Sequence, residues 1–188
     1  MDVESERAPL AELFRLLTDR QITAEEEEEL TAEALSALAD PAAYAEAIAE
    51  ADPSLEWIGQ HYLTGDDPAT DGRLLLRWII YNELGTWVCC SDKLDELLQR
   101  IDDRIAEVGV EMEPLPYDYD EQPEDPLEHY CRRTNEALAK ASGQTKALVR
   151  LGTGMSDEFE LYVVSSADRP RLFALAEHYQ LDCGDSWS

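Results

Sequence analysis

The stretch that most constrains the fold lies near the end of the chain, over residues 147–179. In it, Phe159, Leu161 and Val163 alternate with other residues, which is the pattern of a strand with one covered face. A shorter apolar run precedes this strand, and glycines between the two allow a tight connection. Apolar residues then recur at intervals of three and four, which is typical of an amphipathic helix. The stretch therefore predicts a β-hairpin followed by a helix, a core on which other elements can pack.

The first 56 residues carry helical patterns only and are strongly acidic, with 16 acidic and 3 basic residues. Thr23 and Glu26 have the spacing of a capping box, and the Asp-Pro pair at residues 40–41 ends one helix and begins the next. Five consecutive glutamates occupy residues 25–29. Because consecutive helical positions point in different directions, a solvated helix face is favoured over a cation site. We therefore predict an acidic helical segment over residues 1–56.

The middle of the chain mixes helical and strand patterns. Residues 64–72 are rich in turn formers and predict a loop, whereas the apolar run 73–84 predicts a helix. Residues 86–90 predict a short strand that leads into a further helix. Pro126 begins another helix, and residues 181–183 add an edge strand after the closing helix.

Helices therefore come first, and strands and helices follow, which places the chain in the α+β class. We predict N-terminal helices followed by a small three- or four-stranded, mostly antiparallel sheet with helices packed on one side. Residues 1–56 form the acidic helical segment, and residues 57–188 form an α+β domain that ends in the hairpin and its helix. A chain of 188 residues is short enough for both to make one compact unit.

The charge of the chain limits its partners. With 42 acidic and 15 basic residues, the formal net charge is -27. Such a surface repels nucleic acid and anionic lipid, because it has no basic stripe to neutralise phosphates. It favours a basic protein partner and fast, salt-sensitive association with it. The alternative is that the charge serves solubility alone.

A cytoplasmic location is expected. The first residues lack the basic start and apolar centre of a secretory signal, and no apolar run approaches the roughly 20 residues of a membrane span. The cysteines agree, since Cys131 and Cys183 stand alone and no Cys-x-x-Cys pair occurs. Cys89 and Cys90 point to opposite faces of a predicted strand, which favours packing groups over a redox pair.

Residues 152–164 read Gly-Thr-Gly-Met-Ser-Asp-Glu-Phe-Glu-Leu-Tyr-Val-Val and lead into a helix that ends Ala-Glu-His-Tyr. This pattern resembles the closing segment of domain of unknown function 6630, a group of bacterial proteins. The matching positions are Gly154, Ser156, Asp157, Phe159, Leu161, Val163 and Val164. Met155 is inserted relative to the family's tighter Gly-Ser-Asp form. Residues 86–98, TWVCCSDKLDELL, resemble the family's middle part, so the resemblance extends over residues 57–183. It implies a fold and a bacterial source, and it implies no reaction.

Patterns of catalysis and metal binding are weak. The histidines His61, His129 and His178 fall on three predicted helices without paired spacing, so they predict no metal site. An acidic run that ends at Asp125 faintly resembles a calcium loop, but Pro123 stands where an EF-hand requires glycine. No serine lies in a Gly-x-Ser-x-Gly context. We predict no catalytic residue, no metal ligand and no cofactor.

One segment is suited to contact with another molecule, the proline-rich stretch between residues 114 and 126. Tyrosine supplies a large contact area at low entropic cost, and carboxylates complement a basic partner. The predicted partner-binding residues are Tyr117, Asp118, Tyr119, Asp120 and Glu121. The alternative is a surface loop whose tyrosines pack back on the core.

The sequence does not reveal an activity, and three hypotheses remain. The first is a non-enzymatic acidic bacterial protein that acts by protein–protein binding, most concretely an immunity or antitoxin protein that blocks the basic active site of a cognate toxin. The second is a housekeeping domain that binds a small ligand between the hairpin and the helix after Asp92. The third is an enzyme, which a deep pocket lined by paired carboxylates or a His–Cys contact would favour.

Overall fold

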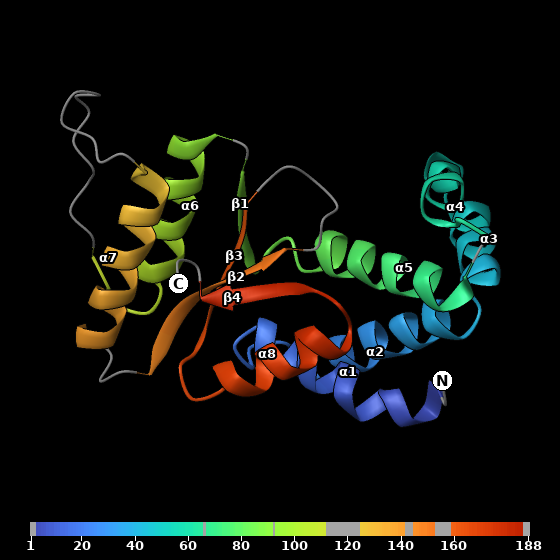
Figure 1. The fold of residues 1–188 in the computed structure, drawn as a ribbon, viewed down its shortest axis with the longest axis horizontal. Coiled ribbons are helices and arrows are strands. Elements are labelled where there is room, and N and C mark those ends of the chain that lie inside the picture. The colour runs from blue at the N-terminus through green and yellow to red at the C-terminus, as the bar shows by residue number, and fades with distance from the viewer. Residues whose placement is uncertain are drawn as a thin grey trace. The chain divides into compact units, whose positions relative to one another are not determined.

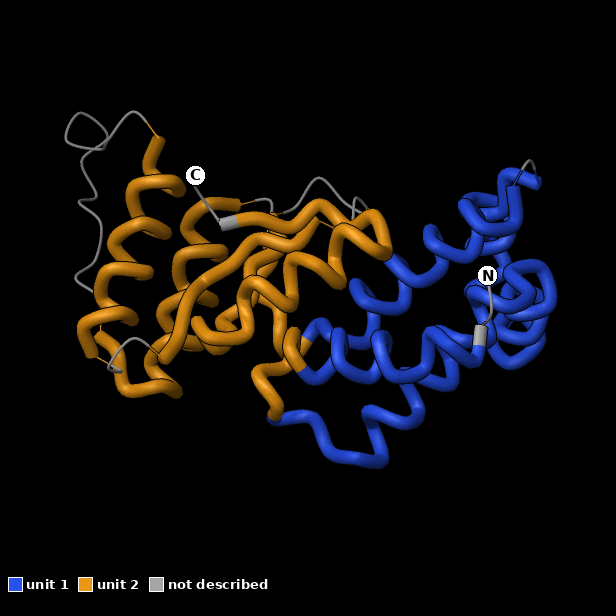
Figure 2. Tube along the Cα trace, turned by 60° about the horizontal axis from the view of Figure 1, so that its bottom comes forward, with its two compact units in different colours: residues 1–15, 21–85 blue, residues 16–20, 86–188 orange. Residues whose placement is uncertain are grey.

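The computed structural model describes residues 3–65, 67–91, 93–111, 125–141, 145–152 and 159–185. These residues form two compact units (Figure 2). Unit 1 comprises residues 1–15 and 21–85, and unit 2 comprises residues 16–20 and 86–188. N-terminal helices precede a four-stranded antiparallel sheet, so the predicted α+β class is confirmed. Within the described residues, no helix combines the length and the apolar character needed to cross a membrane.

Unit 1 is built from helices (Figure 1). In chain order they are α1 (Val3–Leu17), α2 (Ala24–Ala39), α3 (Pro41–Ala51), the short 3-10 helix η1 (Pro53–Leu55), α4 (Glu56–Tyr62) and α5 (Pro68–Glu83). The last two residues of α1 belong to unit 2. Helix α2 packs against both α3 and α5, and α4 packs against α3. The structure thus divides the chain after residue 85, whereas the sequence analysis places the division after residue 56.

The predicted caps of α2 and α3 are confirmed. The backbone N–H of Glu26 donates to Thr23 Oγ1 over 3.2 Å, and the N–H of Thr23 donates to Glu26 Oε2 over 2.9 Å. The hydrogen bond from the Thr23 backbone lowers the pKa of the Glu26 carboxyl. Asp40 accepts from the N–H of Ala43 over 3.1 Å, with Pro41 in the first turn of α3. These caps satisfy backbone donors that a helix N-terminus leaves without an intrahelical partner.

The predicted loop at residues 64–72 is only partly a loop, because α5 already begins at Pro68. Asp67 caps it, in the same aspartate–proline pattern that begins α3. Asp71 is only 4% exposed, and its carboxylate accepts from the Thr64 N–H over 2.9 Å and the Gly65 N–H over 3.2 Å. Although its composition is typical of turns, this stretch contains the first turn of α5. Asp71 in that turn accepts hydrogen bonds from the backbone of residues 64 and 65, which precede the helix.

Helices α2 and α5 approach each other closely at Gly72. A Cβ atom at position 72 would lie 3.1 Å from the carbonyl oxygen of Ala37 and 3.2 Å from the Cα of Leu38. Both are backbone atoms, which cannot rotate away as a side chain can. Gly59 in α4 differs, because a Cβ there would lie 3.5 Å from Ala45 Cβ, an ordinary contact.

The substitution Gly72→Ala should therefore destabilise unit 1 by about 1–3 kcal/mol, the usual effect of overpacking. This loss would occur although alanine favours a helix by about 1 kcal/mol over glycine. Gly59→Ala is the matched control and should be neutral or stabilising. Urea unfolding followed by far-ultraviolet circular dichroism measures both; equal stabilisation by the two substitutions would contradict the close approach.

Unit 2 contains the sheet and the remaining helices (Figure 1). In chain order they are β1 (Val88–Ser91), α6 (Leu94–Ala106), α7 (Pro126–Ala141), β2 (Lys146–Gly152), β3 (Phe159–Ser165), α8 (Arg169–His178) and β4 (Asp182–Asp185). The strand order is β1-β3-β2-β4, and all neighbouring strands are antiparallel. The predicted hairpin is β2 and β3, and the predicted edge strand is β4.

One face of the sheet and the helices α6 and α7 form a continuous core. Cys89, Leu148 and Leu161 contribute to it from three strands. The sequence analysis expects helices on one side of the sheet, and α6 and α7 pack on this face. The opposite face is buried as well, through residues such as Val149 and Tyr162. The hairpin is therefore covered on both faces, and the prediction of a single covered face for its second strand is wrong.

Strand β2 has a special requirement at Leu148. Among the described residues, the pairing of β4 with β2 runs from Val149 to Gly152, and the 1% exposed Leu148 has no partner in β4. The side-chain amide of Asn135 on α7 substitutes for a strand there. Its Oδ1 accepts from the Leu148 N–H over 2.7 Å, and its Nδ2 donates to the Leu148 carbonyl over 3.2 Å. Asn135 thus connects α7 to the sheet through two hydrogen bonds with the backbone of β2.

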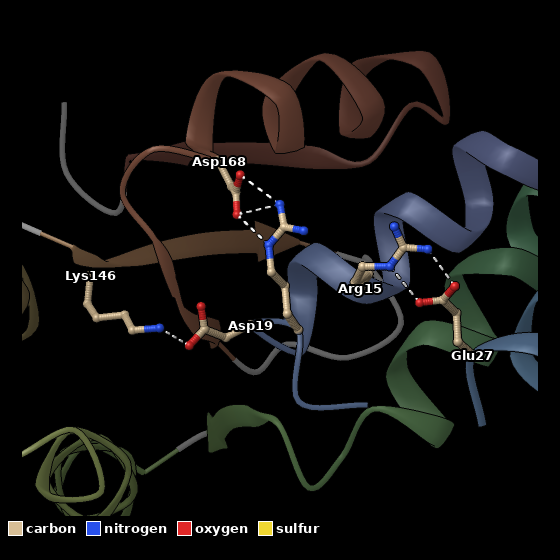
Figure 3. A network of polar contacts seen from close by, with 6 residues as sticks. Arg15, Asp19, Glu27, Lys146 and Asp168 are labelled. Atoms are coloured by element: carbon tan, nitrogen blue, oxygen red, sulfur yellow. Dashed lines mark hydrogen bonds and ion pairs between the residues drawn. The ribbon is translucent and has the colours of Figure 1, made fainter. Parts of the chain in front are cut away.

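Residues 16–20 belong to unit 2 although they lie among the residues of unit 1. Asp19 and Arg20 both have left-handed backbone conformations, with φ of 52° and 63°. Asp19 pairs with Lys146 at the start of β2 (Figure 3). The guanidinium of Arg20 donates to both oxygens of Asp168, over 3.1 and 3.0 Å. Two ion pairs therefore connect this strained segment to β2 and to the residue before α8, all within unit 2.

The substitution Asn135→Leu should destabilise unit 2 by about 2 kcal/mol or more, because it leaves two buried backbone groups without their partner. Glu136→Leu is the matched control, since it introduces the same side chain at the next, exposed position of α7. We expect it to change the free energy of unfolding by less than about 0.5 kcal/mol. Chemical unfolding of the full chain, with hydrogen exchange of the Leu148 amide, measures both; unchanged exchange in Asn135→Leu would refute the role of the amide.

Candidate partner-binding site

The five predicted contact residues Tyr117, Asp118, Tyr119, Asp120 and Glu121 lie outside the described residues. Gly154, Ser156 and Asp157 of the closing motif also lie outside them. The structure therefore places neither set. It does describe Asp125, which follows the predicted contact segment and caps α7 by accepting from the Glu128 N–H over 2.9 Å.

A pocket of about 250 Å³ lies where α7 begins. Its described lining comes from the end of β1, the start of β3 and the first turns of α6 and α7. The lining residues are Ser91, Leu94, Leu97, Asp125, Pro126, Leu127 and Phe159. The pocket thus includes Asp125, which follows the acidic tyrosine segment by four residues in the sequence.

The pocket has an apolar floor and an exposed aromatic rim. Leu97 and Leu127 are buried in the core between the sheet and the helices α6 and α7. Phe159, at the first position of β3, is 43% exposed. A partner that covers this side chain removes apolar surface from contact with water, which contributes favourably to the free energy of binding.

The polar rim of the pocket is organised by α6. Ser91 Oγ accepts from the Lys93 N–H over 3.1 Å, and Lys93 Nζ donates to Glu96 over 2.7 Å. The hydrogen bond and charge of Lys93 lower the pKa of the Glu96 carboxyl. Asp125 adds an exposed carboxylate on the side of α7. An apolar cavity with one carboxylate, that of Asp125, among its lining residues suits a side chain or a small molecule that is apolar in the middle and cationic at its end.

The volume of the pocket limits its occupant. At about 250 Å³ it is smaller than the 300–1,000 Å³ typical of drug-sized ligand sites. One large side chain of a partner, or a small metabolite, fits that space.

Negative charge is distributed over both units. By sequence, unit 1 has 19 acidic and 4 basic residues, and unit 2 has 23 and 11. Part of the glutamate run in α2 forms ion pairs within unit 1. Glu27 accepts from Arg15 over 2.7 and 2.6 Å (Figure 3), and Glu28 accepts from Arg7 over 2.7 Å. The predicted solvated helix face is therefore also a set of helix-to-helix ion pairs within unit 1.

Burial shifts the pKa values of two thiols and one tyrosine of the sheet upward. Burial raises the pKa of the Cys89 thiol and of the Cys183 thiol to about 12, which keeps both protonated at neutral pH. Burial also raises the pKa of Tyr162 well above its usual value. All four cysteines are free thiols, and the described residues contain no group of three or more histidine, cysteine or acidic side chains placed to hold a metal.

Phe159 is the residue that the sequence analysis assigned differently. It was expected to lie with Leu161 and Val163 on one covered face, and it does share their face but is exposed. It lies at the first position of β3, beside the first turns of α6 and α7. Its position at a strand end next to a glycine-containing connection is the sequence signal for this exposure.

Comparison with known proteins finds no match. No family model matches the chain, and neither a curated protein sequence nor a solved structure matches it. The resemblance to domain of unknown function 6630 stays a prediction that rests on the residues of the closing motif.

Proposed function

We propose that this protein acts by binding a basic protein partner, without chemistry of its own. In its most concrete form the proposal is an immunity or antitoxin protein that covers the basic active site of a cognate toxin. A toxin that acts on nucleic acid or nucleotides has a basic cleft, which an acidic surface can occupy in place of phosphate.

The observation that carries the proposal is the half-exposed Phe159 at the mouth of an apolar pocket in a protein of net charge -27. Binding energy at interfaces is concentrated in a few aromatic and apolar anchors surrounded by polar residues. Charge of one sign accelerates association with a partner of the other sign. The pocket supplies the anchor, and the acidic residues supply the steering.

The acidic tyrosine segment, residues 117–121, enters this proposal through its side-chain chemistry. The segment contributes three carboxylates and two tyrosines next to Asp125 in sequence. Tyrosine and carboxylate side chains together suit arginine-rich surfaces, through stacking and charge-assisted hydrogen bonds.

A second candidate function is the binding of a small metabolite in the same pocket. It is favoured by one observation: the pocket lies between the hairpin strand β3 and the helix that follows Asp92, where the sequence analysis expects a ligand. A thermal-shift screen of the purified chain with small apolar cations separates the two candidates. Stabilisation that Phe159→Ser abolishes supports the metabolite, because ligand binding stabilises only the folded state that holds it.

The substitution Phe159→Ser should weaken the complex with the basic partner by about 30-fold or more, the loss expected of an interface anchor. Folding stability should change little, since the side chain is 43% exposed. Trp57→Ser in α4 is the matched control, because Trp57 is 46% exposed and lies in unit 1. Affinity purification from the native host at low salt recovers the partner. Titration calorimetry then gives the dissociation constants of its complexes with the wild type and with each variant. Equal affinities for wild type and Phe159→Ser would remove the anchor from the proposal.

Neutralising the acidic segment tests its part separately. Asp118→Asn, Asp120→Asn and Glu121→Gln together should slow association and reduce its dependence on salt, because long-range attraction is lost. A control with three charges removed from exposed positions of α2 and α3 should have a smaller effect; its substitutions are Glu25→Gln, Glu29→Gln and Glu46→Gln. Stopped-flow association rates at low and high salt measure both. A complex left intact and equally fast at low salt would show that the segment takes no part.

A further inference from the structure

Strand β4 is an edge of the sheet, and α8 leads directly into it (Figure 1). Within the described residues, β4 pairs with β2 on one side only. Alternate residues of such an edge strand direct their N–H and C=O groups away from the sheet, where they can pair with another strand.

The turn between α8 and β4 sets the two elements beside each other. Gln180 has a left-handed backbone conformation with φ of 58°. The N–H of Leu181 donates to the carbonyl of Ala176 over 2.8 Å, and the N–H of Gln180 donates to Glu177 over 3.0 Å, which is a Schellman ending of the helix. The buried Leu181 then begins the return of the chain as a strand. A helix and an edge strand joined in this way form the two walls of a groove.

This groove is open and has a volume of about 680 Å³. The helix contributes Phe173, Ala174 and Glu177 to its lining, and the strand contributes Asp182 and Cys183. Phe173 is half-buried, whereas Ala174 and Glu177 are exposed. The groove therefore offers an apolar strip with a carboxylate beside it, along an edge that can accept a strand.

Charge decides which occupant suits the groove. A second copy of this chain would bring another net charge of -27 to the same edge, so self-association is opposed by repulsion. Asp182 is already paired with Arg150 over 3.0 Å, which leaves Glu177 as the carboxylate available to a cation. The lining residues of the groove include two carboxylates and no basic side chain. These features suit a polypeptide that alternates apolar and basic residues.

We propose that the groove between α8 and β4 binds an extended segment of a basic polypeptide, which joins the sheet as a strand next to β4. Main-chain hydrogen bonds to the edge provide affinity, and alternate side chains provide specificity at Phe173 and Glu177. This site shares no residue with the Phe159 pocket, so the proposal stands whether or not that pocket binds a partner.

The probe is a synthetic octapeptide of alternating lysine and valine with both ends blocked, added to the full chain at low salt. We expect binding together with at least about tenfold slower amide exchange in β4, because strand addition protects edge amides. The same peptide with alternate backbone nitrogens methylated should bind at least about tenfold more weakly, since it cannot complete the ladder. A peptide of alternating glutamate and valine should not bind.

Two variants place the binding in the groove. Ala174→Trp fills the groove from an exposed helix position, and Glu177→Lys reverses its charge; each should weaken binding at least about tenfold. Glu136→Lys is the matched control for charge, because it makes the same change at an exposed position of α7 and should bind as wild type does. Circular dichroism establishes that each variant is folded, and Glu177→Lys carries the test if Ala174→Trp does not fold.

Several outcomes would overturn the proposal. One is the absence of binding at about 1 mM lysine–valine peptide. Others are binding without protection of β4, equal binding of the methylated or glutamate peptide, and wild-type affinity in Glu177→Lys. A concentration-dependent dimer that itself protects β4 would identify a second copy as the occupant and would equally refute it.

Discussion

The backbone of β2 imposes the constraint on which unit 2 depends. This strand lies inside the sheet and is buried, so every N–H and C=O along it needs a partner in the protein. Strand β3 satisfies one side over Lys146–Arg150, and β4 satisfies the other side only from Val149 onward. Asn135 supplies the missing pair of hydrogen bonds at Leu148. The position of α7, and with it the first turn that lines the Phe159 pocket, follows from this requirement.

More than half of the basic side chains of this protein form ion pairs with acidic side chains of the same chain. At least eight of the 15 arginine and lysine side chains form ion pairs within the chain, including Arg7, Arg15 and Arg150. Surface ion pairs of this kind add little stability one by one. Their effect here is on the outward field, because they leave an excess of carboxylates that no basic side chain balances. Both proposed binding surfaces draw on that excess.

Local sequence rules predicted the elements well where the determining contacts are local. The capping box of Thr23 and Glu26, the strand β3 and the edge strand β4 all follow from neighbours within a few residues. The single covered face predicted for β3 was wrong, because the structure buries residues on both of its faces. The loop predicted at residues 64–72 was wrong in its second half, because the cap at Asp67 competes with a composition typical of turns. The roles of Gly72 and Asn135 depend on atoms of other helices and strands, which no local pattern encodes. The apolar pocket is of the same kind, since four separate segments line it.

The segment at residues 16–20 has a consequence for how the protein is made. Its two ion pairs connect residues that are far apart in the sequence: Asp19 and Lys146 are separated by 127 positions, and Arg20 and Asp168 by 148. During translation, Asp19 and Arg20 leave the ribosome long before Lys146 and Asp168 exist. The sheet unit therefore cannot close until nearly the whole chain has been synthesised, and such long loops are slow to close.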